Sequence, residues 1–182
     1  YALPGVEIRV TAEEKILPPG ETGIVEVKGP NVFKGYWRMP DKTAEEFRDG
    51  GWFSTGDVGF LSVDGRLTLS GRARDLIIVG GFNVYPKEIE EILDALPEIA
   101  ESAVIGVPHP DMGEGVVAVL APANGCASAP PLSDESLKTA VAELARFKQP
   151  RRFVWLDALP RNAMGKVQKQ ELRNACAGAF SK

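Results

Sequence analysis

An aspartate that directly follows a glycine is the first residue whose type and place suggest chemistry. It ends the tetrapeptide Ser54-Thr55-Gly56-Asp57. The glycine lets the backbone approach a ligand closely, and the carboxylate can accept two hydrogen bonds from a cis-diol such as that of a ribose. An aspartate in an ordinary turn is the alternative, and the tetrapeptide alone does not decide between the two.

A lysine in a basic loop is the second candidate. The pair Gly165-Lys166 lies within Leu159–Val167, a stretch that contains proline and glycine. A lysine on such a loop can bring a mobile positive charge to a phosphate or a carboxylate. The alternative is one more solvent-exposed lysine.

The stretch Gly71–Pro86 places two arginines and an aspartate in front of a short predicted hairpin. Leu76–Val79 is expected to form a buried strand, Gly80-Gly81 a tight turn, and Phe82–Tyr85 the returning strand. Charges placed before such a hairpin suggest a joint between two bodies, with a glycine backbone that a ligand can approach. An ordinary hairpin with solvated charges is the alternative.

Other kinds of active site find little support in the sequence. His109 is the single histidine and stands between prolines without a nucleophile motif, so a structural loop histidine is favoured over a catalytic triad. Cys126 and Cys176 provide neither a disulfide framework nor metal-ligand spacing, which fits a reducing cytoplasm. No metal site, Walker A loop or dinucleotide glycine pattern is found, so the chain by itself contains no phosphate cradle.

Charge and hydropathy narrow the classes of partner. A net charge of −4 argues against nucleic acid, and no apolar run approaches the length of a membrane span. Residues 146–173 nevertheless carry eight lysines or arginines against two acids. This segment is either a solvated face or a surface that receives a multiply charged anion.

The elements that must position these residues change in character near residue 73. Before it the sequence is β-rich, with one helix capped by Asp41. After it strands and helices alternate, and Ser133 is expected to cap the helix predicted over 135–146. The expected strands cover 6–11, 23–28, 58–63, 66–70, 101–107, 115–121 and 152–156, and the expected helices 43–47, 87–96, 135–146 and 168–177. Residues 32–38 are expected to form an aromatic surface loop, and 122–131 a flexible connection.

Three signatures in this order and spacing resemble the C-terminal part of adenylate-forming enzymes, the superfamily of acyl-CoA synthetases, peptide-synthetase adenylation domains and firefly luciferase. They are Ser54–Asp57, Gly71–Glu90 and Leu159–Lys166. Within the superfamily, Gly29–Pro40 and Pro160–Lys169 are most similar to malonyl-CoA synthetases. The likeness extends over essentially the whole chain.

This resemblance implies an α+β fold in two parts. Residues 1–73 would be the β-rich end of a large, incomplete N-terminal domain. Residues 74–182 would be a small, mobile α/β lid domain with a mixed sheet and about three helices. Arg74 matches the hinge about which that lid domain rotates.

The resemblance also implies a two-step reaction. A carboxylic acid and Mg-ATP form an acyl-adenylate, and coenzyme A then displaces AMP. Asp57 would bind the ribose hydroxyls, and Arg72 would assist at the ribose and phosphate. Lys166 would bridge the substrate carboxylate and the α-phosphate. The turn Gly80-Gly81-Phe82 would reach the active site after rotation and admit the pantetheine arm.

Several parts of such an enzyme are not in the sequence. The phosphate loop, the adenine pocket, the acid pocket and the Mg²⁺ site all belong to a preceding N-terminal part, which is therefore the expected partner. We expect a fragment of a cytoplasmic ligase for malonate or methylmalonate that is inactive by itself. A ligase that loads a carrier protein, or a non-catalytic binding or regulatory module of the same fold, is the alternative.

Overall fold

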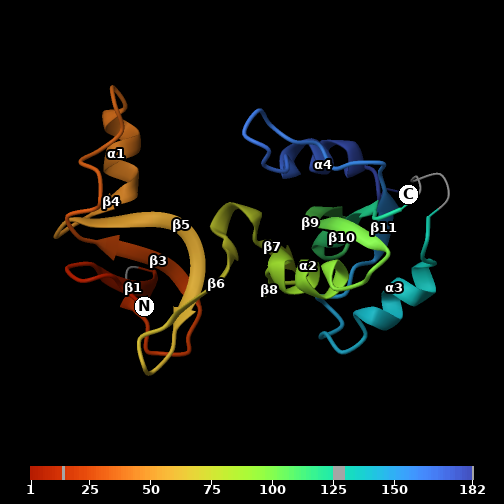
Figure 1. Ribbon diagram of the computed structural model, residues 1–182, viewed down its shortest axis with the longest axis horizontal. Coiled ribbons are helices and arrows are strands. Elements are labelled where there is room, and N and C mark those ends of the chain that lie inside the picture. Colours follow the sequence, from red (N-terminus) through yellow and green to blue (C-terminus); the bar gives the residue numbers. More distant parts are fainter. Residues whose placement is uncertain (14, 125–129, 182) are drawn as a thin grey trace. The chain divides into compact units, whose positions relative to one another are not determined.

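The chain folds into two units, residues 1–74 and 75–182 (Figure 1). The computed structural model describes residues 1–13, 15–124 and 130–181. A single turn of 3-10 helix, η1 (Ala73–Asp75), contains the boundary, which the sequence places one residue earlier. Part of the predicted flexible connection, with Cys126, lies outside the described residues.

The first unit is an antiparallel sheet with one short helix. Its strands follow the order β2-β1-β3-β5-β4, and β6 also pairs with β5. Alternating side chains bury Val10, Val25 and Val58 as its apolar core. The strands are β1 (Glu7–Ala12), β2 (Lys15–Ile16), β3 (Gly23–Lys28), β4 (Phe47–Arg48), β5 (Trp52–Leu61) and β6 (Leu67–Arg72); the helix is α1 (Pro40–Glu46).

Two local predictions for this unit are wrong. Met39, not Asp41, is the N-cap of α1, because Pro40 takes the first helical position and Asp41 falls within the first turn. The side chain of Thr43 in α1 accepts a hydrogen bond from the backbone N–H of Tyr36 at 2.9 Å, which joins the preceding loop to the helix. Strand β5 begins at Trp52 and not at the predicted Val58, so the candidate Asp57 lies inside a strand and the alternative of an ordinary turn is excluded.

The second unit contains a mixed sheet, as expected, and this sheet has five strands. Strand β10 pairs antiparallel with β9 and β7, and parallel with β11. Its elements are β7 (Ile77–Val79), β8 (Phe82–Val84), α2 (Pro86–Asp94), β9 (Ile99–His109), β10 (Gly113–Pro122), α3 (Asp134–Ala140), β11 (Arg152–Trp155) and α4 (Lys169–Cys176). Among all described residues, no helix is long and apolar enough to cross a membrane.

Helices cover both faces of this sheet (Figure 1). Even-numbered residues of β10, such as Val116 and Leu120, pack in one apolar cluster with α2 and α3. Odd-numbered ones, such as Val117 and Val119, pack in a second cluster with Leu172 of α4. Burial on both faces explains why 115–121 is a continuous apolar run. Helix α4 therefore lies across the sheet from α2 and α3.

Helix α3 is shorter than the predicted 135–146. Ser133 caps it as expected, accepting from the N–H of Ser136, but the helix ends at Ala140. The Gln149 side chain donates to the carbonyls of Ala142 and Leu144, at 3.2 and 2.8 Å. These bonds replace helical partners, so the chain continues as turns.

Gly59 in β5 permits close packing of the first sheet, and we expect Gly59→Ala to destabilise that unit. An added Cβ would lie 2.3 Å from the carbonyl oxygen of Thr68, a backbone atom that cannot move aside alone. The expected loss in free energy of unfolding is about 1–3 kcal/mol, measured by urea denaturation. Gly178→Ala, with nothing within 4 Å, is the control and should leave the transition unchanged.

Candidate functional site

Asp57 and Arg72 face each other across β5 and β6. They are register partners, and Arg72 Nε lies 2.9 Å from Asp57 Oδ1. The Asp57 side chain is 28% exposed and that of Arg72 50%. One carboxylate oxygen is thus engaged by arginine, while a carboxylate has capacity for further donors such as a ribose diol. Binding of a ribose diol by Asp57, which the resemblance implies, stays a prediction.

Neighbouring polar groups hold this ion pair in place. Arg72 Nη1 donates to the carbonyl of Thr55 at 3.0 Å, and the Asp57 N–H donates to Thr55 Oγ1 at 3.0 Å. Thr55 in turn donates to the carbonyl of Val25 on β3 at 2.8 Å. Gly56 has a φ of +69°, which disfavours any side chain there. Thr55 and Gly56 therefore contribute to the orientation of Asp57.

A cavity of about 610 Å³ lies beside this tetrapeptide and contains a charge that sequence reasoning missed. Ser54 and Gly56 line it together with Glu26, whose side chain is only 5% exposed. Arg9 Nε lies 2.6 Å from Glu26 Oε2, and Arg48 Nε 3.9 Å from Oε1. The signal in the sequence is a glutamate between two valines of a strand.

Lys166 lies in a loop that is closed by its own hydrogen bonds. The Asn162 side-chain oxygen accepts from the N–H groups of Met164 and Lys166, each at 3.0 Å. Gly165 takes a φ of +76°, and Arg161 and Val167 form an isolated β-bridge. The Lys166 side chain is exposed and forms no ion pair with any described residue. The loop thus presents an unpaired ammonium group.

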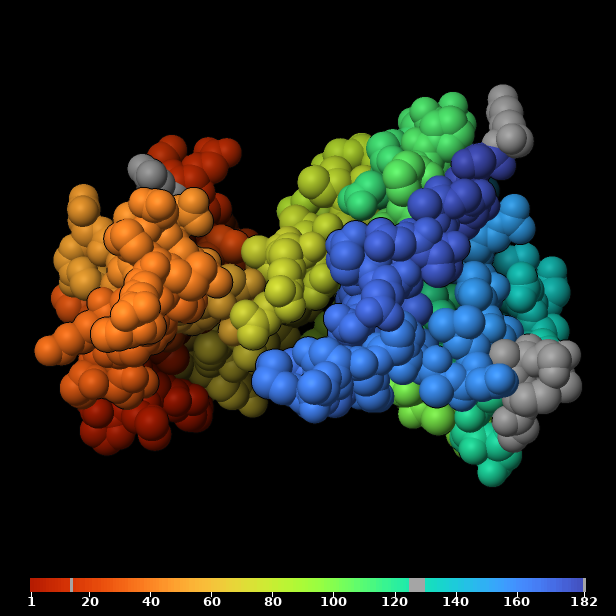
Figure 2. Space-filling view, turned by 90° about the horizontal axis from the view of Figure 1, so that it is seen from above, coloured from red at the N-terminus to blue at the C-terminus, as the bar shows by residue number. Residues whose placement is uncertain are grey.

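Arg161 anchors the loop to the rest of the second unit. It forms an ion pair with Glu101 of β9 and also donates to the carbonyl of Gly165. The segment that contains the loop and α4, in blue, lies on the outside of this unit (Figure 2). The loop is therefore accessible yet fixed at its base.

The predicted hairpin is present and has the expected glycine turn. Gly80 and Gly81 have φ of +57° and +85°, and an added Cβ at either would meet nothing within 4 Å. Such a turn favours glycine and leaves open space above the backbone. Phe82 is 59% exposed and stacks on Phe147, with ring centroids 4.8 Å apart.

Arg74 is exposed in η1, the turn that contains the unit boundary. The structure brings Asp57 to Arg72 within the first unit. Lys166 and the Gly80–Phe82 turn lie in the second unit. The roles of Lys166 and of the Gly80–Phe82 turn at the nucleotide, and that of Arg74 as the hinge, stay predictions.

A basic cleft of about 470 Å³ marks another face of the second unit. Its lining includes Lys138, Arg146, Arg151 and Arg152, which accounts for part of the basic segment seen in the sequence. His109 lies in the same lining at the end of β9, 5.0 Å from the Phe180 ring. The positive charge of the four basic residues in this cleft suits a multiply charged anion.

Comparison with known proteins gives consistent matches. Residues 88–166 match the model of the AMP-binding enzyme C-terminal domain. The chain is 42% identical to a fatty acid–[acyl-carrier-protein] ligase, ScoC, from Streptomyces coeruleorubidus, over 96% of this chain and 33% of that protein. It is 45% identical to a feruloyl-CoA synthase from Amycolatopsis, over 86% of this chain and 31% of that one.

A solved structure is similar over nearly the whole chain. ATP-bound MatB from Rhodopseudomonas palustris shows 52% identity and a TM-score of 0.89, and the match covers 99% of this chain and 36% of that one. The chain thus spans about a third of the length of the relatives it matches.

Proposed function

We propose that the chain is the C-terminal portion of an ATP-dependent acid:CoA ligase, on the premise that residues 88–166 match the model of the AMP-binding enzyme C-terminal domain. The observation that supports this most is the likeness of almost the whole chain to acid ligases, with the signature residues present. The remaining part of the enzyme would supply the acid pocket and most of the ATP site.

In this proposal each candidate residue has one task. Asp57 accepts hydrogen bonds from the ribose of ATP, and Arg72 orients Asp57 and faces the phosphates. Lys166 places its ammonium between the substrate carboxylate and the α-phosphate, where negative charge concentrates as the anhydride forms. ATP enters as its Mg²⁺ complex, and the metal ligands would come from the remaining part.

The second half-reaction would use a different face of the second unit. Rotation at Arg74 withdraws Lys166 and brings the Gly80–Phe82 turn to the adenylate. The open space above both glycines supports this assignment, because a slender pantetheine arm must pass close to backbone. The thiolate then attacks the acyl carbon, AMP leaves, and a thioester forms.

Malonate or methylmalonate is the proposed acid. The motifs Gly29–Pro40 and Pro160–Lys169, which are most similar to malonyl-CoA synthetases, support this choice. Acid-dependent ATP–pyrophosphate exchange in the full-length enzyme tests it with malonate, methylmalonate, acetate and ferulate. Exchange with malonate at the highest kcat/KM is expected; preference for an aromatic acid would contradict it.

The acceptor has a second candidate, because one relative is named as a ligase for an acyl-carrier protein. Thioester assays with coenzyme A and with a phosphopantetheinylated carrier protein separate the two.

The alternative of a non-catalytic module of the same fold predicts that the full-length protein shows no ATP–pyrophosphate exchange with any acid. The isolated 182 residues are expected to be inactive, and exchange by them alone would contradict the need for a remaining part. The reaction is proposed for the cytoplasm.

Asp57→Ala is expected to raise the KM for ATP in the first half-reaction by about 10–100-fold, since a hydrogen bond to a charged group contributes about 1.5–3 kcal/mol. The measurement is exchange kinetics as a function of ATP concentration. Asp64→Ala, an exposed acid in the turn between β5 and β6, is the control. An equal rise in both variants would remove the ribose role from Asp57.

A further inference from the structure

We propose that two ion pairs, Asp75–Arg173 and Glu90–Lys169, clamp α4 so that it positions Lys166 for adenylate formation. The inference rests on the proposed function, because it assigns a task to residues that never touch the substrate. Lys166 precedes α4 by three residues, so the position of that helix, together with the Arg161 anchor at the other side of the loop, sets the position of the lysine. The four clamp residues are positioning residues.

Helix α4 needs such support because it is short. It has eight residues, and Leu172 is the one among them that is fully buried. An isolated helix of this length is unstable in water. Its placement must therefore come from tertiary contacts, and charged side chains provide several of them.

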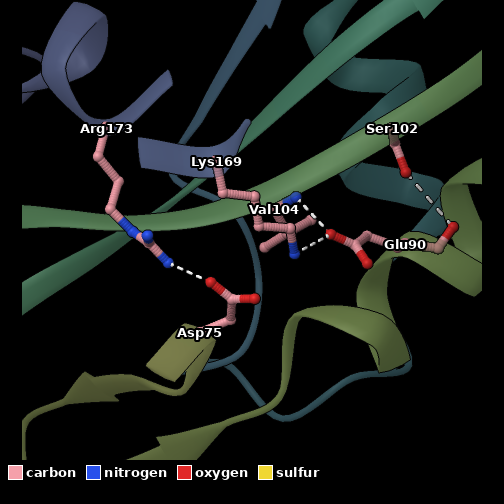
Figure 3. A network of polar contacts seen from close by, with 6 residues as sticks. All are labelled: Asp75, Glu90, Ser102, Val104, Lys169 and Arg173. Carbon is pink, nitrogen blue, oxygen red and sulfur yellow. Dashed lines mark hydrogen bonds and ion pairs between the residues drawn. The ribbon is translucent and has the colours of Figure 1, made fainter. Parts of the chain in front are cut away.

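Glu90 of α2 fixes the first residue of α4. Its Oε1 accepts from Lys169 Nζ at 2.7 Å and from the backbone N–H of Val104 at 2.8 Å (Figure 3). The side chains of Glu90 and Lys169 are 18% and 19% exposed, so solvent screens this pair less than a surface pair. One carboxylate oxygen thus joins α2, β9 and α4.

Asp75 fixes the second turn of the same helix. Arg173 Nη2 lies 2.8 Å from Asp75 Oδ1, and these side chains are 24% and 17% exposed (Figure 3). Asp75 directly follows Arg74 and is the first residue of the second unit. A rotation at the hinge would therefore carry α4 directly, and not only through the ninety or so residues of chain between them.

The clamp also gives two neighbouring lysines different tasks. Lys169 is engaged by Glu90, whereas Lys166 has no ion-pair partner among the residues that the structure describes. Loss of the clamp should move Lys166 without removing it. Because Lys166 acts in the first half-reaction, that step alone should become slower.

The test compares Glu90→Gln and Asp75→Asn with Glu91→Gln in the full-length ligase. Glu91 also lies in α2 and pairs with Lys87, but there both side chains are more than half exposed. In the two clamp variants, kcat for pyrophosphate exchange is expected to fall about tenfold, since small misplacements of a reacting group are costly. The KM values and the thioester rate from supplied acyl-adenylate should stay within about twofold. Glu91→Gln should match the wild type in all of these.

A second set of measurements separates positioning from folding. Lys169→Arg and Arg173→Lys keep the charges and should retain most of the exchange activity. In a Lys166→Ala background the clamp substitutions should cause no further loss, because they act through that lysine. Hydrogen exchange of the 161–168 amides should become faster in the clamp variants and not in Glu91→Gln.

Three results would overturn the clamp: equal losses in both half-reactions, additive losses with Lys166→Ala, or unchanged hydrogen exchange of the loop. A failure of the proposed function looks different. In that case the wild type would show no acid-dependent exchange, or Lys166→Ala would keep it. Faster hydrogen exchange in the clamp variants would still be observable then.

Discussion

Lys166→Ala is expected to lower acid-dependent ATP–pyrophosphate exchange in the full-length ligase by about 10²–10³-fold, the usual cost of removing a group that stabilises developing negative charge. Lys166 is exposed in a hydrogen-bonded loop and has no ion-pair partner among the described residues, which motivates this expectation. Formation of the thioester from supplied acyl-adenylate should stay near the wild-type rate, because Lys166 is withdrawn in that step. Stopped-flow or radiolabel assays of the two half-reactions measure the difference.

The matched control for this substitution is Lys87→Ala. Lys87 is also an exposed lysine of the second unit, but it lies on α2 and pairs with Glu91. It should leave both half-reactions unchanged. Lys166→Arg keeps the charge with a different shape and should retain a part of the exchange activity. Full exchange activity in Lys166→Ala would remove this residue from the mechanism.

Much of the fold could be predicted because its signals are local. Alternation and glycine turns indicated the sheet of the first unit, and the run 115–121 indicated a strand, which the structure places between β9, β7 and β11. Ser133 was identified as a cap by residue type alone, and the structure confirms it. The α+β class and the mixed sheet of the second unit are likewise confirmed.

The errors arise where distant side chains replace local hydrogen bonds. Helix α3 ends early because Gln149, nine residues beyond its last residue, takes two carbonyls that a longer helix would use. The buried Glu26 could be seen in the sequence only as a charge within a strand. Its partners Arg9 and Arg48 come from two other strands, and residue spacing does not reveal such pairing.

The candidate site could be predicted as residues but not as an arrangement. Motif order identified Asp57, Arg72 and Lys166, and the structure adds that Arg72 binds Asp57 directly. The ion pairs of Asp75 and Glu90 with α4 span 98 and 79 residues, respectively. Such long-range pairs depend on tertiary structure, so no local pattern predicts which acid meets which base.

Arg74→Pro is expected to reduce thioester formation by about 10²-fold while adenylate formation falls much less. Rotation of the second unit needs a change of backbone dihedral angles at the joint, and proline holds φ near −65°. Proline also restricts the preceding residue, Ala73, which belongs to the same turn. A joint held in one state should support one half-reaction, and misplacing the Gly80–Phe82 turn by even about 1 Å is costly for the other.

The control for the proline is Arg74→Ala, which removes the exposed side chain but leaves the backbone free to rotate. It should retain both half-reactions, because Arg74 forms no ion pair with any described residue in its place in η1. Comparable losses in the alanine variant would indicate that the side chain itself acts. Equal losses of both half-reactions in Arg74→Pro would identify the stretch as a structural turn without a role in rotation, since a pivot must distinguish the two steps.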